Sequence, residues 1–253
     1  MADSYVGTSG WMYRHWRGPF YPCDLPQAQW FRYYSARLST VEVNNTFYRL
    51  PKSETFAAWR QEAPPGFRYA VKASRYITHL KKLLDAGEPL ERFLSRAREL
   101  AGALGPILYQ LPPHWHEDLG RLAAFLELLP GDLWHVFEFR HPSWYTPETL
   151  ALLDEHGAGF CVQDLPGLET PVCATGKLAY VRLHGPTRPY VGSYSDEELR
   201  AWAQRIEAFL SSGRPAYIYF NNDAQGYAVR NALRLQEMLG REVKAKVAGA
   251  ASL

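Results

Sequence analysis

The stretch AYVRLH at residues 179–184 places apolar and polar side chains in alternation. In an extended strand, Val181 and Leu183 share one face, and Arg182 and His184 share the other. A parallel sheet covered by helices buries its apolar face against those helices. The stretch therefore predicts a strand whose polar face points away from the helices, toward the interior of a closed sheet.

Seven other segments have the same enrichment in β-branched and aromatic residues. They are SYVGTS (4–9), STVEVN (39–44), FRYAVK (67–72), PILYQL (106–111), HVFEFR (135–140), GFCVQD (159–164) and AYIYFN (216–221). The segments recur on average about every 30 residues, the length of one strand–helix unit. Eight such units in 253 residues predict an α/β fold, a single (β/α)8 TIM barrel. A doubly wound open sheet is the alternative, but it rarely needs eight regularly spaced units.

Helix-forming stretches follow most of these strands. Residues 147–157 come after Thr146, a favourable N-cap, and residues 195–213 begin with a serine and an acidic first turn. No linker or change in composition divides the chain. We expect one barrel domain over residues 1–240, followed by a flexible C-terminal tail over residues 241–253.

The composition is that of an ordinary globular protein, with 47% hydrophobic and 21% charged residues. A net charge of +2 is too small to imply a polyanionic partner by itself. The three cysteines form no CxxC pair, which favours a reducing compartment. The N-terminus shows no signal peptide, and no apolar run is long enough to span a bilayer. We therefore expect a cytoplasmic protein with no membrane partner.

Strand parity also assigns polar side chains of the other strands to the barrel axis. The ten residues assigned to it are Glu42, Asn44, Lys72, Gln110, Glu138, Arg140, Asp164, Arg182, His184 and Asn221. Most stand near the C-terminal ends of their strands, where the active sites of this fold lie. Cys161 falls on the helix-facing parity and is expected to be a packed thiol.

The charges in this set are balanced, three acidic against three basic. One interpretation is an internal salt-bridge lattice that fills the barrel. Buried ionic networks stabilise a fold only weakly and usually have another reason to exist. The convergence of ten polar residues on one mouth therefore favours a binding or catalytic pocket.

Several motifs resemble those of the YecE-like family, known as domain of unknown function 72. They are GTSGWMYRHWRGPFYP (7–22), VEVNNTFYRLP (41–51), VKASRYITH (71–79), GPILYQLPP (105–113), FEFRHPSW (137–144), YVRLHG (180–185) and YFNND (219–223). The resemblance implies a TIM barrel similar in architecture to endonuclease IV and xylose isomerase-like proteins. It implies no established reaction, and a nucleic-acid role is suggested only by that structural similarity.

The first candidate chemistry is acid–base catalysis by an enzyme of hydrolase or lyase type on a polar substrate that contains sugar or phosphate. The candidate catalytic residues are Glu42, Glu138, Asp164 and His184. Candidate substrate-binding residues include cations, amides and aromatic rings that suit an anionic or hydroxyl-rich ligand. They are Asn44, Lys72, Gln110, Arg140, Arg182, Asn221, Asn222, Trp11 and Tyr48.

Two alternatives remain. The carboxylates and histidines permit a divalent metal for phosphodiester hydrolysis, but the three cations of the same mouth oppose one, and we expect no cofactor. Basic and aromatic residues after the first strands also suit a non-catalytic protein that binds nucleic acid or a phosphate ligand. No GxGxxG or P-loop motif supports a nucleotide cofactor. A small polar or anionic ligand is the expected partner, and the sequence does not define the oligomeric state.

Overall fold

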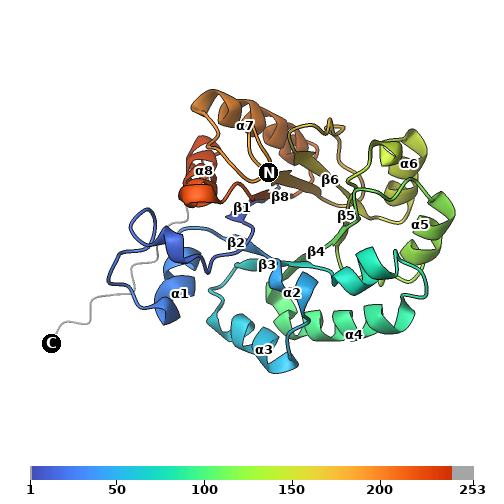
Figure 1. Cartoon of the computed structure of the whole chain (residues 1–253), viewed down its shortest axis with the longest axis horizontal. Coiled ribbons are helices and arrows are strands. Elements are labelled where there is room, and N and C mark those ends of the chain that lie inside the picture. The colour runs from blue at the N-terminus through green and yellow to red at the C-terminus, as the bar shows by residue number, and fades with distance from the viewer. Residues whose placement is uncertain (1, 241–253) are drawn as a thin grey trace.

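The computed structural model describes residues 2–240, in which eight parallel strands form a nearly closed barrel (Figure 1). The strands are β1 (Ser4–Thr8), β2 (Thr40–Val43), β3 (Arg68–Lys72), β4 (Leu104–Gln110), β5 (His135–Glu138), β6 (Gly159–Asp164), β7 (Ala179–Leu183) and β8 (Ala216–Phe220). Each pairs with its neighbours in the order β1-β8-β7-β6-β5-β4-β3-β2. The prediction of a TIM barrel is confirmed. The predicted tail over 241–253 lies outside the described residues.

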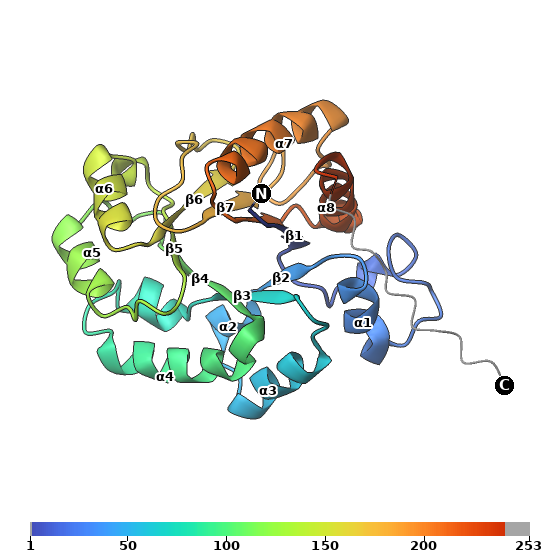
Figure 2. The same ribbon diagram turned by 180° about the vertical axis from the view of Figure 1, so that it is seen from behind.

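The helices surround this sheet, as the views from both sides show (Figure 2). They are α1 (Trp30–Ser35), α2 (Asn45–Tyr48), α3 (Ser53–Glu62), α4 (Gly87–Ala97), α5 (Leu119–Leu126), α6 (Pro147–Glu155), α7 (Asp196–Ser211) and α8 (Tyr227–Met238). The predicted caps are present, because Thr146 accepts from the Thr149 amide and Ser195 forms a capping box with Glu198. No helix of the described residues is long and apolar enough to cross a bilayer.

A tyrosine hydroxyl bridges the seam between the two ends of the strand order, β1 and β2. The Tyr34 hydroxyl accepts from the Thr8 amide at 3.0 Å and donates to the Thr40 carbonyl at 2.9 Å. The strands approach so closely that a Cβ on Gly7 would lie 2.2 Å from the Thr40 carbonyl oxygen. Glycine at residue 7 and tyrosine at residue 34 therefore allow the barrel to close.

The barrel interior has an apolar ring below a polar ring. The apolar ring, which is two side-chain layers deep at β7 and β8, consists of Ala70, Leu108, Val136, Cys161, Leu178, Tyr180, Tyr217 and Tyr219. Side chains two residues further along six of the strands form the polar ring, namely Lys72, Gln110, Glu138, Gln163, Arg182 and Asn221. The lower side chains are at most 2% exposed, so within the barrel a ligand has room above the polar ring, at the C-terminal ends of the strands.

Strand parity is correct for most strands and wrong for β6. Cys161 belongs to the interior ring, whereas Phe160 and Val162 pack outside with the helices. The prediction that Cys161 faces the helices is therefore wrong. Two polar residues, Gln163 and Asp164, end this strand side by side, so polarity alone does not show which of them points inward.

We predict that Tyr34→Phe lowers the free energy of unfolding by roughly 1–3 kcal/mol, because it leaves the buried Thr8 amide and Thr40 carbonyl without this partner. Urea denaturation of the two proteins measures the difference. Tyr33→Phe is the matched control and should change stability by less than about 0.5 kcal/mol. Equal effects of the two substitutions would contradict this account of the seam.

Candidate functional site

A cavity of about 650 Å³ opens at the C-terminal ends of the strands. Its floor is polar and its walls are largely aromatic, as in many small-molecule sites. The lining residues are Tyr13, His15, Asn44, Phe47, Tyr48, Lys72, His79, Gln110, Arg140, Arg182, Tyr190, Asn221, Asp223 and Ala224. Seven of these residues are candidates from the sequence.

Arg182 lies at the centre of the cavity floor, between two glutamates. Its guanidinium donates to Glu42 Oε1 at 2.8 Å and to Glu138 Oε2 at 2.5 Å. All three side chains are at most 1% exposed. Glu42 also accepts from the hydroxyls of Ser9 at 2.7 Å and Tyr180 at 2.6 Å. These contacts satisfy the buried carboxylate, so Glu42 is held rigidly below the cavity.

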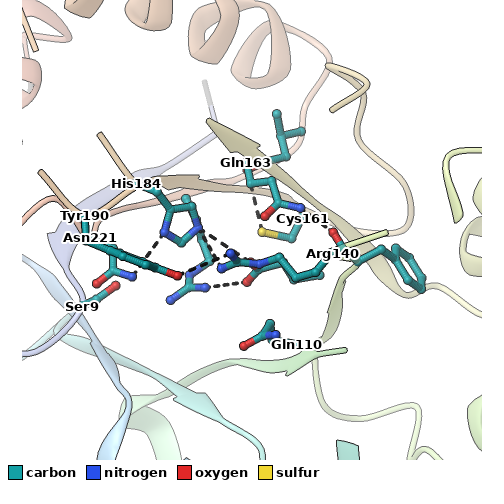
Figure 3. Close-up of polar contacts among 12 residues, drawn as sticks. Ser9, Gln110, Arg140, Cys161, Gln163, His184, Tyr190 and Asn221 are labelled. Atoms are coloured by element: carbon teal, nitrogen blue, oxygen red, sulfur yellow. Dashed lines mark hydrogen bonds and ion pairs between the residues drawn. The ribbon is translucent and has the colours of Figure 1, made fainter. Parts of the chain in front are cut away.

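A chain of polar contacts extends from Glu138 to the opposite wall (Figure 3). Arg140 donates through Nε to Glu138, and its NH2 lies 3.2 Å from His184 Nε2. On the other side of the imidazole ring, Asn221 Nδ2 lies 3.2 Å from His184 Nδ1. Figure 3 shows His184 between Asn221 and Arg140, with Tyr190 nearby. The chain fixes the orientation of the Arg140 guanidinium at the cavity surface.

The two glutamates are permanent anions at neutral pH. Burial by itself would raise the pKa of each carboxyl, but the attached guanidinium groups outweigh burial. The pKa of Glu42 is lowered by Arg182, and that of Glu138 is lowered well below its usual value by Arg140 and Arg182. The neighbouring His184 is neutral, because burial lowers its pKa to about 4. These three groups suit electrostatic and positioning roles better than proton transfer.

Lys72 is the third cation of the cavity floor and has no carboxylate of its own. Its ammonium donates to Gln110 Oε1 at 2.9 Å and lies 4.3 Å from the centre of the Phe47 ring. Within residues 2–240, no carboxylate lies at ion-pair distance from it. Burial, and next the positive charge of Arg182, lower the pKa of Lys72 to about 8. The lysine is therefore protonated at neutral pH at an energetic cost.

Asp223 is a cavity residue that parity did not identify. Its carboxylate accepts from Trp16 Nε1 at 2.6 Å and lies 2.8 Å from His15 Nε2. Burial raises the pKa of Asp223 to about 6. The residue lies past the end of β8, beyond the reach of strand alternation. The only signal in the sequence was the NND sequence at residues 221–223.

Asp164 does not reach the cavity, which corrects the parity prediction for β6. Its carboxylate accepts from Trp202 Nε1 of α7 at 3.2 Å, on the outer side of the barrel. Gln163 takes the inward direction and donates to the Phe139 carbonyl. Asp164 therefore does not line the cavity that the other candidates form.

Three candidate binding residues lie at the margin of the cavity or outside it. Asn222 is buried and donates to the Gly192 carbonyl at 2.8 Å, behind the cavity wall. Trp11 is 8% exposed and packs among other aromatic rings. Tyr48 lines the rim and is 73% exposed, so its ring is accessible to a ligand.

The described residues contain no group of three or more His, Cys, Asp or Glu side chains that could hold a metal ion. Glu42 and Glu138 direct their oxygens at guanidinium groups instead. The donor set of the cavity therefore does not fit a divalent metal.

Comparison with known proteins places this architecture in a family. The model of the family described as "Protein of unknown function DUF72" matches residues 5–252. The chain belongs to the DUF72 family. The match begins in β1 and includes every strand and all the cavity residues named above. It also continues through most of the segment predicted to be a tail.

Two relatives resemble the chain over most of its length, and a third over less than half of it. The UPF0759 protein YunF of Bacillus subtilis is 25% identical over 94% of this chain and 95% of its own length. A DUF72 family protein of Thermotoga maritima has a crystal structure that matches with a TM-score of 0.84 and 32% identity, over 94% of this chain and 99% of that one. The UPF0759 protein YecE of Escherichia coli is 34% identical over 44% of this chain and 42% of its own length.

We predict that Arg182→Met lowers the free energy of unfolding by about 3–5 kcal/mol, because it leaves two buried carboxylates without their guanidinium. The triple variant Glu42→Gln, Arg182→Met, Glu138→Gln removes the uncompensated charges and should recover part of this loss. Denaturant unfolding near pH 7 compares the three proteins. A triple variant that is less stable than the single one would show that charge pairing is not the origin of the effect.

We predict that Lys72→Met raises the free energy of unfolding near pH 7 by roughly 1–3 kcal/mol, because the folded state binds the Lys72 proton less tightly than the unfolded chain. Below pH 8 the wild type bears this cost in full. Between pH 8 and about 10.5 the folded lysine is neutral while the unfolded one is still charged, so the wild type recovers stability and the difference shrinks.

Denaturant unfolding at a series of pH values measures this difference, with Lys177→Met at an exposed lysine as the control. That control should not share the gain in stability at pH 7. A Lys72→Met protein that is less stable than the wild type at pH 7 would contradict the assignment of Lys72 as a destabilising group.

Proposed function

We propose that this DUF72 protein is an enzyme of hydrolase or lyase type that acts on a small polar substrate carrying an anionic group, such as a phosphate or a sugar phosphate. The observation that carries the proposal is the unpaired cation at the cavity floor. The two carboxylates of Glu42 and Glu138 neutralise the two guanidinium groups of Arg140 and Arg182. The positive charge of Lys72 therefore has no negative counterpart at the cavity floor. A surplus positive charge in a partly desolvated cavity attracts an anion.

The cavity above the network distinguishes a ligand-binding site from a salt-bridge lattice that only fills the barrel. A lattice that only filled the barrel would be covered, yet Arg140, Arg182 and Lys72 all line an open cavity. The lowered pKa of Lys72 indicates that its positive charge is unfavourable without an anionic partner. Functional sites commonly retain groups that cost stability in this way.

The side chains around the cavity support separate roles. Arg140 is a donor fixed by Glu138 and is suited to bind the anionic group. The amides of Asn44, Gln110 and Asn221 are suited to hold substrate hydroxyls.

Two groups of the cavity have pKa values near neutrality, and these suit proton transfer. Lys72 has a pKa of about 8, and Asp223 has a pKa of about 6. Groups in one site whose pKa values bracket neutrality are candidates for the base and the acid. We assign proton transfer to this pair instead of Glu42 and Glu138.

A nucleic-acid ligand is the second candidate, supported by the rim of the cavity. Tyr48 lines the cavity, is 73% exposed and is followed by Arg49 in the sequence. Tyr76 is 44% exposed and lines a separate hollow, with Lys81 Nζ 5.9 Å from the centre of its ring. Exposed aromatic rings among cations suit the stacking of single-stranded bases. In this case the cavity would receive one nucleotide, and no turnover would accompany binding.

We expect small anions to stabilise the wild type and not Lys72→Met. The measurement is the thermal shift caused by inorganic phosphate, ribose 5-phosphate, glycerol 3-phosphate and citrate, followed by calorimetric titration of the strongest. The affinity should fall about tenfold or more in Lys72→Met, because that variant loses the surplus charge. Asp164→Asn is the matched control, because its carboxylate lies outside the cavity.

Turnover of the best ligand, followed by phosphorus and proton NMR, tests the enzymatic part of the proposal. Binding of single-stranded DNA without binding of any small anion would favour the second candidate. Equal binding of anions by the wild type and Lys72→Met would contradict the proposed site.

A further inference from the structure

We propose that Lys72 is a nucleophile, and that its amine forms an imine with the carbonyl carbon of a substrate that also carries an anionic group. The inference rests on the proposed function and narrows it. The substrate class becomes an anionic aldehyde or ketone, such as a 2-oxo acid or a keto sugar phosphate. The reaction class becomes that of a lyase that works through an imine.

The first support is the hydrogen-bond partner of the amine. Lys72 ends β3 with only 9% of its surface exposed, and its Nζ atom meets an amide oxygen of Gln110 and the face of Phe47. A carboxylate partner would hold the proton on the lysine. A neutral acceptor allows the ammonium to lose its proton and leaves a lone pair for attack.

The second support is the pair of guanidinium groups on the same floor. Burial, and next Arg182, disfavour the charged form of Lys72, as does Arg140; Glu138 and Glu42 act in the opposite direction, and the pKa stays lowered. A lysine that is desolvated and next to other cations is the environment in which amine nucleophiles are found in enzymes. The same guanidinium groups attract the anionic part of a substrate, which would bring its carbonyl group to Nζ.

The third support is the presence of a neutral imidazole beside the amine and of one group for the accompanying proton transfers. His79 lines the cavity and packs edge-on against Phe47, the ring that also contacts Lys72. Its Nδ1 lies 2.9 Å from the Thr78 hydroxyl, and burial lowers the pKa of the ring to about 4, so the imidazole is neutral. Asp223, whose pKa is raised by burial to about 6, lines the same cavity as the proton-transfer group.

The proposed step balances without any external reagent. The lone pair of the neutral amine forms a bond to the carbonyl carbon, the carbonyl π electrons move to oxygen, and that oxygen takes a proton from the Asp223 carboxyl group. The nitrogen then gives one of its protons to the Asp223 carboxylate, which passes it to the new hydroxyl group, and the carbon–oxygen bond breaks to release water and leave Asp223 ionised. The product is an iminium ion, which can accept the electron pair of a carbon–carbon or carbon–hydrogen bond adjacent to it.

Reductive trapping tests this inference on the full-length wild type. The protein is incubated near neutral pH with pyridoxal 5′-phosphate or with pyruvate, and sodium borohydride then reduces any imine to a stable amine. Peptide mass spectrometry locates an adduct with the mass of the probe less one oxygen atom. A cavity of about 650 Å³ can admit either probe.

We expect Lys72 to be labelled about tenfold or more faster than the exposed Lys177, because a far larger fraction of its amine is neutral at this pH. Inorganic phosphate should slow the labelling of Lys72 and leave that of Lys177 unchanged. Lys72→Arg keeps the positive charge but removes the amine nucleophile, so it should lose the Lys72 adduct and still bind phosphate. Lys177→Arg is the control and should still form the Lys72 adduct.

Labelling with pyridoxal 5′-phosphate alone would indicate a phosphate-bearing carbonyl substrate, and labelling with both probes a site that also accepts a carboxylate. No adduct at Lys72 with either probe, while phosphate still raises the melting temperature, would overturn the imine and leave the anion site intact. Absence of both the adduct and any phosphate effect would overturn the inference and the proposed function together. Equal labelling of Lys72 and Lys177 would also overturn the inference.

Discussion

The buried pairing of Arg182 with Glu42 and Glu138 is the interaction on which the rest of the site depends. It joins β2, β5 and β7 across the barrel axis, with 2.8 and 2.5 Å contacts in the interior. Two buried carboxylates would be too costly without the guanidinium, and the guanidinium would be too costly without them. Glu138 in turn fixes Arg140, and Arg140 contacts His184. The network thus links three strands and forms a rigid, charged floor below an open cavity.

The network also explains why proton transfer falls to other residues. Glu42 and Glu138 have lowered pKa values because they face guanidinium groups, so they remain anions throughout the neutral range. Within residues 2–240, Lys72 has no carboxylate and Asp223 no guanidinium at ion-pair distance, so burial outweighs the other charges and moves their pKa values toward neutrality. The fixed charges and the titrating groups of the cavity are therefore different residues.

The sequence predicts the barrel and most of the floor, because a period of two is enough to sort the side chains of a covered parallel strand. The parity prediction fails for Asp164, because two adjacent polar residues at the end of β6 leave the inward-facing one undecided. In the structure the Trp202 indole donates to the Asp164 carboxylate outside the barrel. The parity prediction also does not identify Asp223, whose position depends on the loop after β8 and on contacts with His15 and Trp16 from the other end of the chain. Strand alternation carries no information about such loops. Nor does it reveal that Lys72 lacks a carboxylate partner, since a count of charges suggests a balanced set.

The most direct test of this account is the pKa of the Lys72 amine, followed by NMR of the side-chain carbon next to the nitrogen, with Lys72→Arg to assign the signal. We expect the Lys72 amine to have a pKa of about 8 in the free protein. Inorganic phosphate should raise that pKa, because a bound anion favours the charged amine. A pKa near the ordinary lysine value of about 10.4 that does not respond to phosphate would contradict this account.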